Sequence, residues 1–263
     1  MIITKENYYS RDANKEYMSC SQYKALMKCE AAALAELDGK YVRPSTTALL
    51  VGGYVDAYFS GEKDEFAEQH PEIFLKNGID LKAEYRKAND IIARIERDDM
   101  LMRFLGGEKQ VIMTGDIGGV PWKIKMDVYF ADEAIVDMKI MRDFEPIYVP
   151  EKGRVPWYVA WDYILQLSAY QHIVAQNNGG KKLPCYIVAA TKQEPCDIDL
   201  INIPQVMLDT ELKGIEANVE YIHMVKQGLV EPRRCQKCDY CRETKVITEP
   251  SLASYICDDD GVY

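Results

Sequence analysis

Apolar positions in the first hundred residues follow the period of an amphipathic helix. They recur at intervals of three and four residues, which is the spacing that buries one helical face. Ser19 or Ser21 can cap the first helix, because a serine hydroxyl accepts a hydrogen bond from a free N–H of the first turn. The pattern therefore predicts three helices, at 19–38, 45–60 and 80–105, with the charged and turn-rich stretch 61–80 as a connection.

The period changes to two after residue 109, where alternating and β-branched runs begin. Gly115, the pair 118–119 and the turn 131–133 interrupt these runs, so we expect three antiparallel strands in a meander. The remaining elements are expected as a Pro-rich loop at 141–158, a helix at 159–177, a buried strand at 183–192, a short strand at 197–203 and a long helix at 205–228. This order predicts an α/β chain with one central sheet.

The length of 263 residues favours one decorated domain. We divide it into a helical N-terminal part (1–106), a core (107–203) and a C-terminal helix with a cysteine cluster (204–263). The chain has 32 basic and 42 acidic residues, hence a net charge of −10. That charge disfavours a protein whose whole surface coats nucleic acid or anionic membrane. Neither a signal peptide nor a membrane span is recognisable, so a cytoplasmic location is expected.

Two aspartates and a lysine are the first candidate site. Asp137 and Lys139 alternate with Met138 on one predicted strand, so they point to the same face, and an adjacent antiparallel strand can bring Asp127 beside them. Paired carboxylates suit Mg²⁺, and a lysine can orient a water and balance phosphate charge. Isolated charges in the apolar run IVDMKI are costly unless paired or metal-bound. A half-exposed hairpin or a buried ion pair without catalysis remains the alternative.

Three more residues become candidate site residues only in combination with the two aspartates and the lysine. Gln166 and Tyr170 lie one helical turn apart and share a helix face. Asp56 is an acidic residue in the apolar helix segment GGYVDAYF. Taken singly, each is an ordinary boundary, core or exposed residue.

The motifs GGYVDAYF, KIKMD, IVDMKI and QLSAY stand in an order that resembles the PD-(D/E)xK nucleases. The resemblance is to the RecB-like branch, which includes RecE-type (exodeoxyribonuclease VIII-like) and phage exonucleases. SQYKALMKC and CQKCDYC extend it towards both ends of the chain. It implies a restriction-endonuclease-like α/β core, with a central mixed sheet that contains the antiparallel meander and is flanked by helices.

The resemblance also implies roles for the site residues. Asp127, Asp137 and the carbonyl of Met138 would coordinate Mg²⁺ or Mn²⁺, and Lys139 would position the hydrolytic water. Gln166 and Tyr170 would hold substrate or brace the lysine. Asp56 stands where many RecB-like nucleases have a histidine, and aspartate can still serve as a metal ligand.

The activity implied is metal-dependent exonucleolytic hydrolysis of DNA, at linear duplex ends or on single strands, in recombination or end resection. A single-strand annealing protein as partner and a homo-oligomeric ring also follow from the resemblance. Basic side chains that could contact backbone phosphates are Lys125, Arg142, Lys152, Arg154 and Lys192. For any one of them, an ordinary solvated charge is the alternative.

A trio of cysteines, Cys235, Cys238 and Cys241, has gaps of two residues each. Three thiols at this spacing are compatible with zinc and a fourth ligand or with an iron–sulfur cluster, and three free thiols in a polar segment are the alternative. Candidates for the fourth ligand are Cys29, Cys257 and His223. Some RecB-like nucleases hold a [4Fe–4S] cluster with one N-terminal and three C-terminal cysteines, which resembles Cys29 with the trio, although their second gap is longer.

Two other functions remain open from the sequence. The first is an iron–sulfur RecB-like nuclease that acts on single strands. The second is a non-catalytic DNA-binding recombination module with a zinc-like cysteine knuckle. The complete set of Asp127, Asp137 and Lys139 argues against a dead site.

Overall fold

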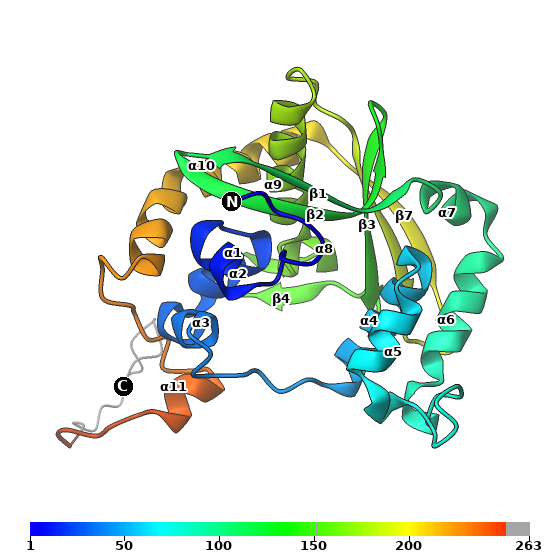
Figure 1. The fold of residues 1–263 in the computed structure, drawn as a ribbon, viewed down its shortest axis with the longest axis horizontal. Helices are drawn as coiled ribbons and strands as arrows, with labels where there is room; N and C mark the ends of the chain where they lie inside the picture. Colours follow the sequence, from blue (N-terminus) through cyan, green and yellow to red (C-terminus); the bar gives the residue numbers. More distant parts are fainter. Residues whose placement is uncertain (151, 251–263) are drawn as a thin grey trace.

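A five-stranded mixed sheet forms the centre of the molecule, in a computed structural model that describes residues 1–150 and 152–250 (Figure 1). Its strands run in the spatial order β1-β2-β3-β6-β7. Only β3 and β6 pair in parallel, and the other neighbours are antiparallel. The strands are β1 (Glu108–Ile117), β2 (Val120–Phe130), β3 (Ala134–Met141), β6 (Cys185–Thr191) and β7 (Ile198–Ile203). The predicted meander and the mixed-sheet α/β fold class are therefore confirmed.

The parallel pair requires a crossover connection between β3 and β6. Helix α9 (Tyr163–Asn177) supplies it, preceded by the short helix α8 (Trp157–Ala160). The Pro-rich segment 141–158 was expected to be a plain loop, and this was wrong. It holds a small antiparallel hairpin of β4 (Ile147–Val149) and β5 (Gly153–Val155).

Helices cover both faces of the sheet (Figure 1). Helix α9 packs on β1, β2 and β3, and α10 (Gln205–Lys226) packs on α9. The opposite face is covered by α4 (Thr47–Ser60), α6 (Lys87–Glu96) and α7 (Asp99–Phe104). Each face of the sheet thus has its own hydrophobic core, the α9 core on one side and the α4 core on the other. On β3, Ile135 packs in the α9 core, whereas Val136 and Met138 pack in the α4 core. Strand alternation predicts that Val136 and Met138 share a face.

The predicted helix 19–38 is two helices. They are α2 (Cys20–Lys28), capped by Ser19 as expected, and α3 (Glu30–Leu37). Between them Cys29 is extended, with φ −162° and ψ 104°. A helical backbone cannot pass through these angles, so the chain changes direction at this residue.

Other helix predictions were also too coarse. The stretch 80–105 divides into a 3-10 turn (Ala83–Tyr85), α6 and α7, because Asp98 caps a new helix. The stretch 61–80 contains α5 (Lys63–Gln69) and a 3-10 turn (Pro71–Ile73). Helices α1 (Arg11–Glu16) and α11 (Asp239–Glu243) were not predicted. Among the described residues, no helix combines the length and apolar character needed to cross a bilayer.

Candidate active site and cysteine cluster

Asp127 and Asp137 lie on the adjacent antiparallel strands β2 and β3, and both face the same lysine. The Nζ of Lys139 lies 2.5 Å from Oδ2 of Asp137 and 4.0 Å from Oδ2 of Asp127. Oδ2 of Asp127 also accepts a hydrogen bond from the backbone N–H of Met138 at 2.8 Å. The structure thus brings together the three charged residues that the strand pattern placed side by side.

An interruption in the strand ladder occurs at Asp127. The β1–β2 register pairs Lys109 with Val128 and Val111 with Met126, so Gln110, at a φ of 53°, and Asp127 stand opposite each other without pairing. Positive φ is uncommon for a residue other than glycine. Met126 consequently packs in the α9 core and Val128 in the α4 core, although they are two residues apart. Asp127 makes no pair with β1 at this point and instead accepts the hydrogen bond from Met138 on β3.

Helix α9 connects the two strands through Gln166 and Tyr170. The amide nitrogen of Gln166 donates to Oδ1 of Asp137 at 2.7 Å and to the hydroxyl of Tyr170 at 3.2 Å. That hydroxyl donates to the carbonyl of Lys125 at 3.0 Å. Gln166 therefore braces Asp137 rather than contacting Lys139 directly.

Burial dominates the electrostatics of Asp137, which is 0% exposed. Burial raises its pKa to about 7 against the opposing effect of Lys139. Burial by itself would lower the pKa of Lys139, but Asp137 and Asp127 outweigh it, and the net shift is upward. Lys139 is thus held as a cation beside the two acids.

Asp56 on α4 joins this group. Burial, and then the charge of Asp127, raise the pKa of Asp56 to about 7. A cavity of about 10 Å³ is lined by Asp56, Asp127, Lys109 and Met138, among others. This volume is at the lower limit of what can hold one water molecule.

The donor set fits a hard divalent cation. Asp127 and Asp137 lie against Lys139, and Asp56 lines the small cavity beside Asp127, so three carboxylates gather at one place. Oδ2 of Asp137 is buried and, beyond its ion pair with Lys139, has no hydrogen-bond partner in the described part of the chain. Lys139 is the positive partner of this buried oxygen, and a bound cation would supply a second one. These three carboxylates with the Met138 carbonyl could hold Mg²⁺ or Mn²⁺.

Three further residues lie at the site and were missed by sequence reasoning. Lys24 donates to the carbonyls of Trp161 and Asp162 at 3.2 Å each, and its charge acts on Asp137. The ring centre of Tyr163 is 5.0 Å from Nζ of Lys139. Lys109 lines the small cavity. Their approach depends on helix and strand packing, so no local pattern indicates it.

The predicted basic contacts have different surroundings. Lys125 is closest to the site, since its charge acts on Asp56 and its Nζ lies 5.0 Å from the ring centre of Tyr9. The Nζ of Lys192 donates a hydrogen bond to the carbonyl of Ile140 at 3.1 Å. Arg142 pairs with Asp143 and is 88% exposed. Lys152 and Arg154 are exposed at the β4–β5 hairpin.

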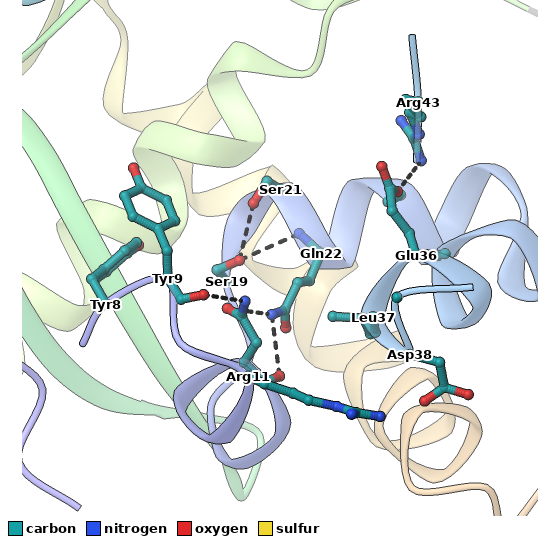
Figure 2. Close-up of a pocket in the computed structure, with 14 residues that line it drawn as sticks. Tyr8, Tyr9, Arg11, Ser19, Ser21, Gln22, Glu36, Leu37, Asp38 and Arg43 are labelled. Carbon is teal, nitrogen blue, oxygen red and sulfur yellow. Dashed lines mark hydrogen bonds and ion pairs between the residues drawn. The ribbon is translucent and has the colours of Figure 1, made fainter. Parts of the chain in front are cut away.

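A larger cavity, of about 510 Å³, lies among the N-terminal helices (Figure 2). It is lined by residues of α1 to α3 and the segments next to them, and none of the predicted site residues lines it. In Figure 2, Gln22 reaches towards α1, where its amide donates to Asn14, and Arg43 pairs with Glu36 at 3.1 Å. These contacts join the N-terminal helices to one another.

The cysteine trio has a fourth partner in Cys29. The four Sγ atoms of Cys29, Cys235, Cys238 and Cys241 all lie within 4.8 Å of one another. Cys29 thus occupies the position expected of a fourth ligand. His223 lies elsewhere, lining a hollow with Asp12 and Pro121, and Cys257 is outside the described residues. The remaining thiols, Cys20, Cys185 and Cys196, do not join the cluster.

One thiol of the cluster is prone to ionise. Burial acts to raise the pKa of Cys235, but the backbone N–H groups of Lys237 and Cys238 outweigh it and lower the pKa to about 6. By contrast, burial raises the pKa of Cys238 to about 12. Ligation of a metal requires thiolates, and Cys235 is the first that would supply one.

Comparisons with known proteins bear on the family and the fold of the chain. A family model described as "PDDEXK-like domain of unknown function (DUF3799)" matches residues 19–244. The crystal structure of a protein named "Putative exonuclease" from Eubacterium rectale is 45% identical, with a TM-score of 0.91, and the match covers 96% of this chain and 97% of that one. The structure of SSO0001 is 15% identical with a TM-score of 0.30, covering 83% of this chain and 92% of that chain, and carries no weight. No curated protein matches the chain.

Proposed function

The chain belongs to the family of PDDEXK-like domains (DUF3799), and from this premise we propose that it is a divalent-metal-dependent DNA exonuclease. Two findings support nuclease activity: the family match, and the similarity of this chain to a protein named as an exonuclease. The finer assignment, a RecE-type enzyme of recombination or end resection, rests on the order of motifs from GGYVDAYF to QLSAY.

The observation that carries the proposal is the meeting of Asp127, Asp137 and Lys139. Asp137 is fully buried in a strand whose only other charged residue is Lys139, and a buried charge without a task is expensive. Its two oxygens are oriented by different groups, Oδ1 by Gln166 and Oδ2 by Lys139. Such orientation of an acid by surrounding groups is typical of a metal ligand.

Each residue can be given a task in phosphodiester hydrolysis. Asp56, Asp127, Asp137 and the carbonyl of Met138 would hold Mg²⁺ or Mn²⁺, which when bound supplies Lewis-acid activation of the phosphate and of water. Lys139 would hold the attacking water with an N–H donor and offset the negative charge that grows on the phosphate. Gln166 would keep Asp137 in place, and Tyr170 would keep Gln166 in place.

DNA would reach this site over a small cationic and aromatic surface, despite the net charge of −10. Tyr9 is 70% exposed and lies beside Lys125, and Trp161 is 47% exposed with Nζ of Lys28 5.8 Å from its ring centre. Lysines bind phosphates and exposed aromatic rings can stack on bases. The protein would therefore grip DNA locally rather than through its whole surface.

A direct test uses end-labelled linear DNA and closed circular DNA, each incubated with Mg²⁺ or with EDTA. We expect metal-dependent loss of linear DNA only, no loss with Asp137→Asn, and full activity with Asp199→Asn, an exposed acid on β7. If linear DNA survives with Mg²⁺, or if Asp137→Asn degrades it as fast as the parent, the nuclease proposal is wrong. Equal loss of circles would disprove the exonuclease assignment, and binding without any cleavage would indicate the non-catalytic module.

A further inference from the structure

Four thiols from distant parts of the chain converge on one point. Sγ of Cys29 lies 3.5 Å from Sγ of Cys241, which lies 4.0 Å from Sγ of Cys235, and all four sulfur atoms fall within 4.8 Å of one another. Around one Zn²⁺ with zinc–sulfur bonds of about 2.3 Å, the edge of the sulfur tetrahedron is about 3.8 Å. The observed separations are close to this edge.

The same separations disfavour the two other products of clustered cysteines. A [4Fe–4S] cluster inserts a cube of iron and sulfide between its thiolates, so its four ligand sulfur atoms must lie much farther apart than around one ion. A disulfide needs sulfur atoms at about 2.05 Å, and each described cysteine is a free thiol. One ion at the centre fits the set as it stands.

Backbone N–H groups already point at two of the sulfur atoms. The N–H of Cys238 lies 3.3 Å from Sγ of Cys235, and the N–H of Cys241 lies 3.5 Å from Sγ of Cys238. Cys238 is also the N-cap of α11, and this helix begins with Asp239 and places Cys241 one turn later. Donors of this kind stabilise thiolates and hold metal ligands in orientation.

Cys29 completes the set because the chain is extended there. In a single helix over 19–38, Cys29 would be an ordinary helical residue. Its extended backbone, with a φ of −162°, instead places Cys29 at the junction of α2 and α3. Figure 1 shows α11 beside α3, and the two helices are in contact. A cavity of about 350 Å³, lined by Cys29, Cys235 and Cys238 together with Lys28 and Tyr41, leads to the sulfur atoms and would admit an ion.

From this geometry we infer that Cys29, Cys235, Cys238 and Cys241 bind one structural Zn²⁺ ion. The ion fastens the segment around α11 to the junction of α2 and α3. Two hydrogen bonds run alongside it, from the N–H of Ala31 to the carbonyl of Arg233 at 3.1 Å and from the N–H of Arg233 to Glu30 at 2.7 Å. A metal that joins residues so distant in sequence removes much conformational freedom from the unfolded chain.

The four-cysteine zinc site also supports the candidate active site, although the two sites share no residue. Helix α2, which ends at Cys29, packs on α9. The thiol of Cys20 lies 3.8 Å from the carbonyl of Gln166, and Lys24 bonds the carbonyls of Trp161 and Asp162 at the start of α9. The zinc site therefore holds α2 in place, and α2 in turn holds the helix that carries Gln166.

The test starts from the full chain, prepared without an affinity tag or chelator, and measures zinc, iron and acid-labile sulfide. We expect about one zinc per chain, no iron or sulfide, and no visible absorption. Cys238→Ser should lose most of the zinc, Cys238→His should retain it because Cys3His sites bind zinc, and Cys196→Ser, a thiol outside the cluster, should match the parent.

Thermal unfolding supplies a readout that does not depend on activity. Removing zinc from the parent protein with a strong chelator should lower Tm, and adding zinc back should restore it, while the chelator should leave the Tm of Cys238→Ser unchanged. Iron with sulfide in the parent, or a folded parent that takes up no zinc when zinc is supplied, would overturn the inference. Equal loss of zinc in Cys196→Ser would do the same.

Discussion

Gln166 donates its side-chain N–H to Oδ1 of Asp137 at 2.7 Å, which joins α9 to the centre of the sheet. Asp137 is fully buried, so this hydrogen bond and the ion pair to Lys139 decide the orientation of its carboxylate. The amide is itself held by Tyr170. The position of Asp137 therefore depends on a helix that follows it by more than twenty residues.

Removing this amide should impair activity more than it impairs DNA binding. Gln166→Ala is expected to lower kcat by about 10- to 100-fold, the usual cost of losing a group that orients a metal ligand. KM for linear DNA should change little. Gln166→Glu should be worse, because it places a second carboxylate against Asp137. Steady-state kinetics on linear duplex DNA measure both, and an unchanged kcat in Gln166→Ala would contradict this role.

Replacing Lys139 should separate metal binding from catalysis. Lys139→Met keeps much of the aliphatic stem and removes the charge, so turnover should fall by about 100-fold or more. Mn²⁺ affinity should stay the same or rise, because Asp127 and Asp137 lose their cationic neighbour. Calorimetric titration with Mn²⁺ alongside a cleavage assay distinguishes the two effects. Loss of metal binding together with activity would show that the lysine acts chiefly in holding the site together.

Asp56 should contribute to metal affinity through its charge and oxygen atoms. Asp56→Asn is expected to weaken Mn²⁺ binding by about tenfold, whereas Asp56→His should restore part of it because imidazole is also a metal ligand. Asp64→Asn, which changes an exposed acid on α5, is the matched control. Equal Mn²⁺ affinity in the parent and Asp56→Asn would remove Asp56 from the ligand set.

The pH dependence follows from two carboxylates with pKa values of about 7, Asp56 and Asp137. A carboxylate whose pKa is raised on folding binds its proton more tightly in the folded state. Its contribution to stability is therefore full below the unfolded pKa, about 3.9, and is lost as pH rises through about 7. The metal-free protein should melt at a lower temperature at about pH 8 than at about pH 6.

Metal binding should show the opposite trend, because the ion requires both acids to be ionised. Affinity for Mn²⁺ should fall as pH drops below about 7, and the stabilisation that Mn²⁺ provides should shrink with it. Melting curves with and without Mn²⁺ at several pH values check both trends. An Mn²⁺ affinity independent of pH between about 6 and 8 would mean that these acids ionise in their ordinary range.

The sequence by itself determined the core sheet and the charged part of the candidate site. The period of two over 109–140 predicts β1 to β3, because a half-buried strand must alternate its side chains. The same alternation places Asp137 and Lys139 on one face and Met138 on the other, as the structure has them. The order of motifs added Gln166 and Tyr170, which helix periodicity alone treats as ordinary residues.

Only the tertiary structure decided the break at Cys29 and the approach of Lys24 and Lys109. A periodic pattern continues through Cys29, so local propensity favours one helix from 19 to 38. The extended conformation is instead stabilised by partners about two hundred residues away, Arg233 and the cysteine trio. Contacts of such long range are formed by packing, not by the neighbours of a residue in sequence, and a local pattern contains no information about them.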